Sequence, residues 1–264
     1  MTDLTALGAT EARRLIACKQ LSPVELTEAC IARTEALDHA VNALIARDFD
    51  RALAGARKAE QAVMEGAPLG PLHGLPLAVK DMIDVAGLPT TYGSEAFADN
   101  IAQGDDAIIA TMRQAGALPI GKTNTPEWSA GGNTRNRVNG VTANPYDLSR
   151  TCAGSSGGSA VALACGYAPL ATRSDTGGSL RNPAAYCGIV GFRPSPGVVP
   201  GDTRAAGLIP MPTSGPMARS VADAGLMLSV MARPDRNDPF TTVIDGRTPW
   251  EAGAFANLPR RDLT

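Results

Sequence analysis

The sequence predicts an α/β fold, in which strands and helices alternate along one chain. Apolar runs of strand length alternate with segments whose apolar residues recur at helical spacing, and this alternation is typical of α/β proteins. The 264 residues are enough to bury a sizeable core. No internal repeat and no linker rich in proline and serine divides the sequence, so we expect one domain over residues 1–264.

The first 65 residues are predicted to form a mainly helical N-terminal segment of that domain. Ser22 begins a helix as its N-cap, because a proline follows it and Glu25 completes a capping box. A preceding helix is expected over residues 5–19. A following helix is expected over residues 48–65 and ends at Gly66.

Helices and strands alternate in the rest of the chain. The expected strands are residues 75–79, 83–85, 118–121 and 168–174. The expected helices are residues 106–115, 159–166 and 220–232. Residues 123–158 contain the segments NTPEW, GGNTRN, ANPYD and CAGSSGG and are predicted to be mostly loop, while the periodicity is weak from Pro234 onward.

The composition argues against several classes of protein. A net charge of −2 provides no basic surface for nucleic acid. The N-terminus lacks the basic and apolar runs of a signal peptide, and no apolar stretch reaches the roughly 18 residues of a membrane span. The five cysteines are widely spaced without a C-x-x-C, which favours neither a disulfide framework nor a zinc site. We therefore expect a cytoplasmic protein that binds neither nucleic acid nor membrane and holds no metal or other cofactor.

One motif is a false match to a nucleotide-binding loop. Residues 116–123 fit the phosphate-loop pattern G-x-x-x-x-G-K-[ST]. That loop needs flexible residues before the lysine and a helix after it. Here the variable residues are apolar and resemble a strand, and Asn124-Thr125-Pro126 is a poor helix start.

Two clusters of serine and glycine indicate chemistry on a carbonyl group. They are the segments 154–159 and 175–179, about twenty residues apart, with a small-residue helix and a strand between them. Such turns can direct several backbone amides toward one point, where they bind an anion. A serine hydroxyl beside such amides could attack a carbonyl whose developing negative charge the amides stabilise.

Lysine is the candidate base for such a serine. Only two histidines are present, His39 and His73, and their positions suit a helix end and a turn. The cluster 175–179 does not have the G-x-S-x-G elbow of the α/β-hydrolases. Lys80 follows the apolar strand 75–79 into the interior, where a lysine can lose its charge near neutral pH.

These segments together resemble the amidase signature family. The resemblance rests on Lys80 in GLPLAVKD, the cluster GSSGGSA and the segment SDTGGSLRNPA, with GKTNTPEW, TANPYD, GIVGFRPSPGVVP and GPMARSVAD in the same order. It extends over nearly the whole chain. It implies a mixed central β-sheet flanked by helices.

The resemblance also implies a catalytic triad of two serines and a lysine. Ser179 would be the nucleophile, Ser155 the bridging serine in a cis peptide bond with Gly154, and Lys80 the base. The oxyanion hole would consist of the amides of Thr176, Gly177, Gly178 and Ser179. Supporting positions would be Gly154, Ser156, Asp175 and Arg181, with Ser156 acting through a hydrogen bond.

The sequence departs from the family pattern in three respects. Cys152-Ala153 replaces the usual Pro-Gly before the first cluster, and Arg173 stands where the family generally has a small residue. A buried arginine needs a carboxylate partner or an exit to solvent. Family members are also longer, so the C-terminal part of the fold is expected to be missing. An isolated 1–264 chain is therefore expected to be poorly soluble or weakly active, because incomplete sheets expose edges and apolar faces.

The implied function is hydrolysis of a small-molecule carboxylic amide through a serine acyl-enzyme, with ester or carbamate cleavage as a side activity. One alternative is a glutaminase, similar to the amidotransferase component that releases ammonia from glutamine. The region from GFRPSPGVVP to GPMARS resembles the free-standing hydrolases more closely. The other alternative is a truncated, inactive chain. A homodimer is compatible with all three.

Overall fold

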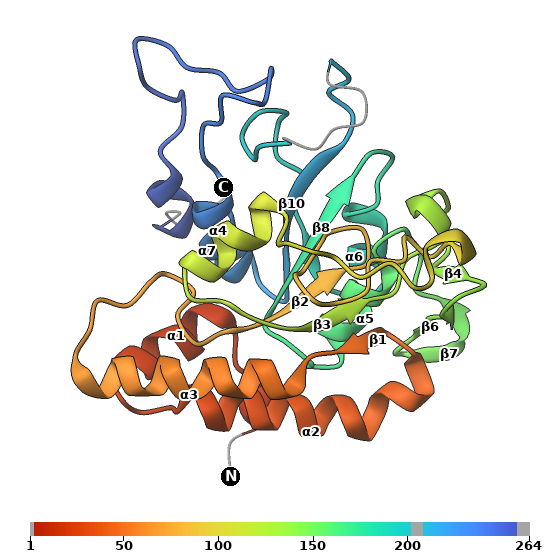
Figure 1. The fold of residues 1–264 in the computed structure, drawn as a ribbon, viewed down its shortest axis with the longest axis horizontal. Coiled ribbons are helices and arrows are strands. Elements are labelled where there is room, and N and C mark those ends of the chain that lie inside the picture. The colour runs from red at the N-terminus through yellow and green to blue at the C-terminus, as the bar shows by residue number, and fades with distance from the viewer. Residues whose placement is uncertain (1–2, 202–207, 258–264) are drawn as a thin grey trace, which may run out of the picture.

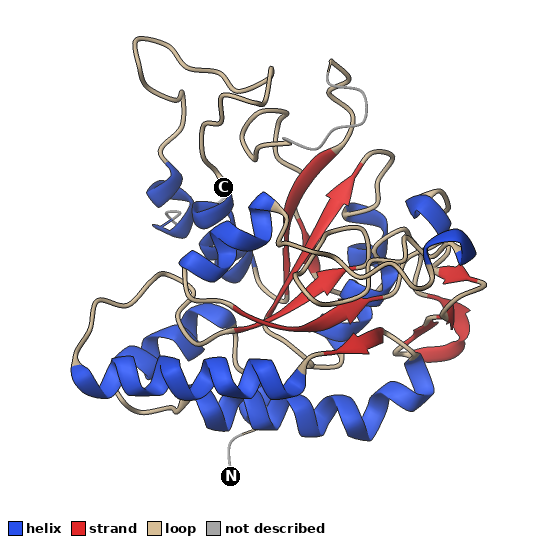
Figure 2. Ribbon diagram, in the orientation of Figure 1, coloured by secondary structure: helices blue, strands red, loops and turns tan. Residues whose placement is uncertain are grey.

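A mixed sheet lies at the centre of the fold with helices packed around it (Figures 1 and 2). The computed structural model describes residues 3–201 and 208–257. The helices are α1 (Ala9–Ala17), α2 (Pro23–Val41), α3 (Phe49–Glu65), α4 (Ala107–Gln114), α5 (Gly157–Ala164), α6 (Arg181–Tyr186) and α7 (Val221–Met231). The strands of the central sheet are β1 (Leu44–Arg47), β2 (Pro76–Lys80), β3 (Leu118–Thr123), β8 (Leu170–Asp175), β9 (Val190–Gly191) and β10 (Thr213–Ala218).

The central sheet has six strands in the order β1-β3-β2-β8-β10-β9. Strand β2 runs parallel to both β3 and β8, whereas the β1–β3, β8–β10 and β9–β10 pairs are antiparallel. The predicted mixed sheet is thus confirmed. Because β2 and β8 are parallel neighbours, their carboxyl ends lie at the same edge of the sheet.

Short elements complete the description. The 3₁₀ helices are η1 (Leu4–Ala6), η2 (Glu95–Phe97), η3 (Glu127–Ser129) and η4 (Ala252–Asn257). The region predicted to be loop contains two small hairpins, formed by β4 (Arg135–Asn136) with β5 (Gly140–Val141) and by β6 (Ala143–Asn144) with β7 (Asp147–Thr151).

Both faces of β2 are buried, and each face belongs to a different core. Leu77 and Val79 pack into the cluster that includes residues of α1, α2 and α7. Ala78 packs into the second cluster, around Val161 of α5. Side chains alternate along a strand, so Lys80 shares the face of Ala78 and is directed toward α5.

Local sequence signals set several helix boundaries as predicted. The Ser22 hydroxyl accepts hydrogen bonds from the amides of Val24 and Glu25, and Glu25 completes the capping box. Helix α3 ends at Gly66 in the left-handed conformation (φ 72°). Asp106 caps α4 by accepting from the Ile108 amide.

Two local predictions were wrong. Residues 83–85 form no strand, because the chain turns directly after β2: the amides of Met82 and Ile83 both donate to the carbonyl of Lys80. The expected helix 5–19 is instead η1 followed by α1. It is interrupted at Gly8, where an added Cβ would lie 2.7 Å from a carboxylate oxygen of Asp223.

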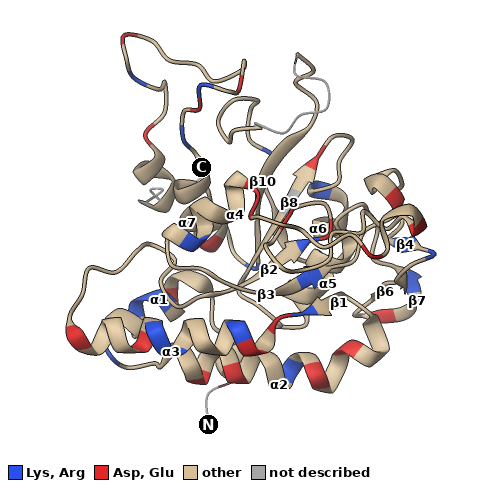
Figure 3. Ribbon diagram, viewed as in Figure 1, with Lys and Arg blue, Asp and Glu red and all other residues tan. Residues whose placement is uncertain are grey.

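Strand β9 is the last strand of the central sheet in the part of the chain that the structure describes. An apolar groove of about 310 Å³ lies beside it, between β9 and α7, and is lined in part by Phe192, Val221 and Leu228. Phe192 and Val221 are 47% and 63% exposed. Charged residues of both signs lie along α2 and α3 (Figure 3). No described helix is long and apolar enough to span a membrane.

Candidate active site

Lys80 lies at the carboxyl end of β2 in the interior of the protein. Its side chain has no exposed surface, and its Nζ donates a hydrogen bond of 2.7 Å to Oγ of Ser155. Ser155 is itself 1% exposed. The contact joins two residues that are 75 positions apart in the sequence, at the end of the sheet where β2 and β8 lie side by side.

Ser155 sits in a tight turn that leads into α5. The peptide bond between Gly154 and Ser155 is cis, as the resemblance implies. The Thr125 hydroxyl donates to the carbonyl of Ser155 at 3.0 Å. Glycine is needed where α5 begins, because a Cβ on Gly157 would lie 2.3 Å from Oγ1 of Thr134. In the first serine–glycine cluster, the glycines therefore allow close packing, and the serines provide hydroxyl groups.

Ser156 behaves differently from the expectation. Its hydroxyl is buried and has no hydrogen-bond partner among the described residues. The supporting hydrogen bond expected of Ser156 is therefore not seen in this structure. A buried hydroxyl without a partner costs about 1–3 kcal/mol.

Asp175, the last residue of β8, organises the second serine–glycine cluster. Its carboxylate is buried and accepts from the amides of Gly178 at 2.8 Å and Leu180 at 3.1 Å, and from Nε of Arg181 at 3.0 Å. Burial on its own raises the pKa of Asp175. The hydrogen bonds from Arg181 and from the two amides outweigh burial, so the pKa lies below its usual value.

Ser179 is half-buried within this turn, between Gly178 and Leu180. The Gly178 amide already donates to Asp175, whereas Thr176 and Gly177 are exposed. The proton relay from Ser179 to Ser155, and the four-amide oxyanion hole, stay predictions. Parallel pairing of β2 with β8 accounts for the turn lying at the same sheet edge as Lys80.

Lys122, from the false phosphate-loop match, is a buried residue of β3. Its Nζ donates to the carbonyl of Pro89 and to the hydroxyl of Thr90, and lies 3.5 Å from Oδ1 of Asp81. The segment before it is a strand and not a phosphate-binding loop, as predicted.

His73 forms a hydrogen bond of 2.9 Å with the carbonyl of Ala59, which is a structural role.

The departures from the family pattern have different outcomes. Cys152 is buried, with its Sγ 3.3 Å from the carbonyl of Thr142, and burial raises the pKa of its thiol to about 11. Ala153 adopts a positive φ of 61°, in the left-handed region where the family generally has glycine. The side chain of Arg173 lies outside the described residues, so the expectation for its partner is untested.

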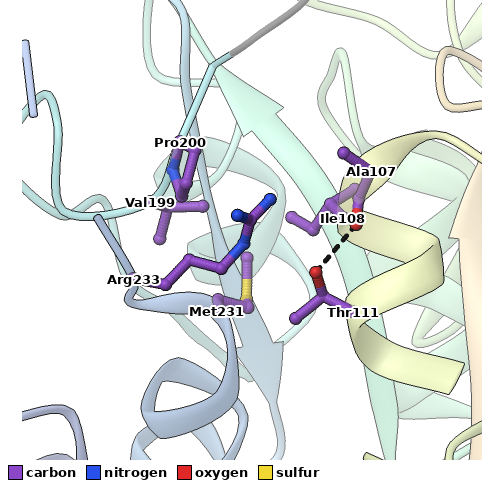
Figure 4. Close-up of a pocket in the computed structure, with 7 residues that line it drawn as sticks. All are labelled: Ala107, Ile108, Thr111, Val199, Pro200, Met231 and Arg233. Carbon is purple, nitrogen blue, oxygen red and sulfur yellow. Dashed lines mark hydrogen bonds between the residues drawn. The ribbon is translucent and has the colours of Figure 1, made fainter. Parts of the chain in front are cut away.

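Other hollows lie away from this site. A small cavity of about 10 Å³ lies between α4, the C-terminal end of α7 and the segment of Val199 and Pro200. Figure 4 shows its lining residues, among which the Thr111 hydroxyl donates to the carbonyl of Ala107. None of the predicted catalytic residues lines it. No group of three or more histidine, cysteine, aspartate or glutamate side chains in the described part of the chain could hold a metal ion.

Comparison with known proteins finds relatives that match most of this chain. The family model described as Amidase matches residues 25–256. The chain is 43% identical over 239 residues to an acylamidase of Rhodococcus erythropolis, covering 90% of this chain and 50% of that protein. It is 42% identical over 249 residues to one component of the glutamyl-tRNA(Gln) amidotransferase of Chloroflexus aurantiacus, covering 93% and 50% respectively.

Solved structures agree with the sequence relatives. A bacterial aryl acylamidase of the amidase signature family superimposes with a TM-score of 0.86 at 35% identity, over 90% of this chain and 50% of that chain. The peptide amidase of Stenotrophomonas maltophilia superimposes with a TM-score of 0.83 at 36% identity, over 93% and 52%. The chain thus spans about half the length of the relatives it matches.

Proposed function

The chain belongs to the amidase signature family, and from that premise we propose that it hydrolyses the amide bond of a small carboxylic amide. The observation that carries the proposal is the 2.7 Å hydrogen bond between the buried Lys80 amine and the Ser155 hydroxyl. This contact supports a role for Lys80 as the base that acts on Ser155. The second serine, Ser179, is half-buried in a turn at the same edge of the sheet. The acylamidase and peptide amidase relatives support the same reaction class.

In the proposed reaction, Lys80 acts as a neutral amine. It takes the proton of Ser155, Ser155 takes the proton of Ser179, and Ser179 Oγ forms a bond to the carbonyl carbon. The resulting oxyanion is stabilised by amides of the 176–179 turn. The relay then returns the proton to the nitrogen as the C–N bond breaks. The amine leaves, and water attacks the acyl-enzyme by the same relay, releasing the acid and restoring Ser179.

Burial of Lys80 favours this role. Transfer of an ammonium group from water to a protein interior is unfavourable, so a buried lysine gives up its proton more readily than an exposed one. The supporting residues of the proposal are Gly154, Ser156, Asp175 and Arg181. A Cβ on Gly154 would lie 2.9 Å from the carbonyl oxygen of Gly131, so glycine fits this close approach. The carboxylate of Asp175 accepts from the Gly178 amide in the turn and from Arg181.

Reaction with a fluorophosphonate probe tests the proposal directly. The purified chain is treated with the probe, and the modified residue is located by peptide mass spectrometry. Labelling of Ser179 that is lost in Ser179→Ala is the expected result. A cooperatively folded chain that is not labelled would instead favour the inactive alternative.

A second candidate is the glutaminase reaction of an amidotransferase. It is favoured by the 42% identity to the glutamyl-tRNA(Gln) amidotransferase component. Release of ammonia from glutamine, compared with hydrolysis of simple aliphatic and aryl amides by the same preparation, separates the two. Preference for glutamine, together with co-purifying partner proteins, would favour this candidate.

We also propose a cytoplasmic location, with a homodimer as one oligomeric state to test. The five cysteines are all free thiols, which supports a reducing compartment. Fractionation of cells that express the protein tests the location. Sedimentation of the purified protein tests the oligomeric state.

A further inference from the structure

The carboxylate of Asp175 is held by two arginines that come from different parts of the chain. Arg181 belongs to α6, which directly follows the Ser179 turn, and its side chain is 56% exposed. Arg193 lies beyond β9, and its side chain is 22% exposed. The buried carboxylate therefore has one partner that is well exposed to solvent and one that is mostly enclosed.

Arg193 contacts Asp175 at two points. Its Nη1 donates to the main-chain carbonyl of Asp175 and lies 3.3 Å from Oδ1 of the same residue. The carbonyl belongs to the last residue of β8, directly before the turn. The carboxylate in turn accepts from the amides of Gly178 and Leu180, which flank Ser179. The Arg193 guanidinium is thus linked through the Asp175 carboxylate to the two residues that flank Ser179.

The path of the chain after β9 brings Arg193 to this point. The Phe192 amide donates to the carbonyl of Pro216 in β10 at 3.1 Å. A Cβ on Gly215 would lie 2.2 Å from the carbonyl oxygen of Phe192, so only glycine allows the segment to pass this close. Arg193 is thereby attached to the sheet, whereas Arg181 belongs to the helix that continues from the turn.

We propose that Arg193 is a positioning residue, which fixes the Ser179 turn against the sheet by holding the carbonyl and carboxylate of Asp175. This inference rests on the proposed function, because it assigns Arg193 a part in presenting the nucleophile. Arg193 acts through Asp175 and not on the substrate. Its loss therefore lowers kcat and leaves KM nearly unchanged.

The test compares Arg193→Met with Arg113→Met. Arg113 is a matched control: it is 32% exposed and donates to Asp105 at 2.8 Å, away from the Ser179 turn. Displacing reacting groups by about 1 Å can cost on the order of 10²-fold in rate. Arg193→Met is expected to slow fluorophosphonate labelling of Ser179 by about 10- to 100-fold, in a protein whose melting temperature stays close to that of the control.

Two further measurements separate positioning from general stability. Hydrogen exchange at the amides of Gly178 and Leu180 is expected to accelerate in Arg193→Met and to stay unchanged in Arg113→Met. Added guanidinium is expected to restore part of the labelling rate in Arg193→Ala in a saturable way, because it can occupy the vacated position. Arg193→Lys is expected to be intermediate, since an ammonium group is a compact point charge without the planar fork of a guanidinium.

The outcomes distinguish this inference from the proposed function. Labelling of Arg193→Met at the wild-type rate would overturn the inference and leave the amidase proposal intact. If wild-type protein is not labelled, the amidase proposal fails, and hydrogen exchange alone decides whether Arg193 orders the turn. Unchanged protection of Gly178 and Leu180 in Arg193→Met would then overturn the inference as well.

Discussion

Lys80 and Lys122 lie on neighbouring strands, are both fully buried, and face opposite sides of the sheet. In the β2–β3 register, Val79 pairs with Lys122 and Lys80 pairs with Thr123. Paired residues of parallel strands share a face, so Lys122 lies on the side of Val79 and Lys80 on the side of α5. The 2.6 Å hydrogen bond between the hydroxyls of Thr123 and Ser159 of α5 agrees with this assignment.

The two sides offer their lysines different partners. Lys80 donates to the hydroxyl of Ser155, whereas Lys122 donates to the hydroxyl of Thr90 and is in addition ion-paired with Asp81. Burial lowers the pKa of Lys122 and raises that of Asp81, and the attraction between the two opposes both shifts. Burial by itself therefore does not determine whether a lysine is charged. The carboxylate of Asp81 favours the charged form of Lys122, and in the proposed reaction the hydroxyl of Ser155 provides the proton that Lys80 accepts.

Replacement of Lys80 is expected to have the largest effect on activity. Loss of a general base typically costs about 10²–10⁴-fold, so Lys80→Met should lower kcat/KM for an amide by at least that range. Lys122→Met, assayed on the folded fraction, should lower it far less. Circular dichroism verifies folding of both variants. Substantial activity of Lys80→Met near neutral pH would contradict the lysine-base assignment.

Replacement of Lys122 is expected to have the largest effect on stability. Lys122→Met leaves Asp81 buried without its cation, and breaking such a pair typically costs about 3–5 kcal/mol. Lys58→Met, on the exposed side of α3, serves as the control and should stay within about 0.5 kcal/mol of wild type. Urea unfolding followed by circular dichroism measures both. Equal stability of the two variants would mean that the Asp81 pair contributes nothing.

A double variant tests whether Asp81 and Lys122 are coupled. Asp81→Asn removes the buried charge, and the asparagine side-chain oxygen can still accept from Thr91, whose backbone amide donates to Asp81 in wild type. The double variant Asp81→Asn/Lys122→Met is therefore expected to be more stable than Lys122→Met alone. Stability losses that simply add would show that the two side chains are not coupled.

Acidification is expected to have a smaller effect, through Asp175. Its folded-state pKa lies below the ordinary value of 3.8, so the stability it contributes is present above about pH 4 and is lost as the pH falls through the lower folded value. Wild type should therefore lose more stability between pH 5 and pH 3 than Asp175→Asn. Urea unfolding at pH 5, 4 and 3 measures this difference, and parallel curves for the two proteins would contradict it.

Features governed by neighbouring residues could be predicted from the sequence. The cap at Ser22, the end of α3 at Gly66 and the start of α4 after Asp106 depend on backbone groups a few residues away. The apolar strand before Lys80 predicted its burial for the same reason. The resemblance to the amidase signature family added the pairing of Lys80 with Ser155, which no local pattern contains.

Features governed by distant residues were decided only by the tertiary structure. The short strand β1 and the strand β10 have weak local signals and exist because β3 and β8 offer them hydrogen-bonding edges. The contact of Arg193 with Asp175 likewise depends on the close passage of Phe192 over Gly215.

The different environments of the two buried lysines show most clearly which features neighbouring residues set and which the tertiary structure sets. Strict alternation from Ile120 would direct Lys122 toward the core that contains Ile120 and α5. The register between β2 and β3 shifts by one residue near Gly121, whose φ of 154° accompanies the irregularity. A one-residue shift reverses the face of every later side chain. The sequence alone predicted that Lys80 is buried, and the register of the assembled sheet decided which lysine meets a serine and which one meets an aspartate.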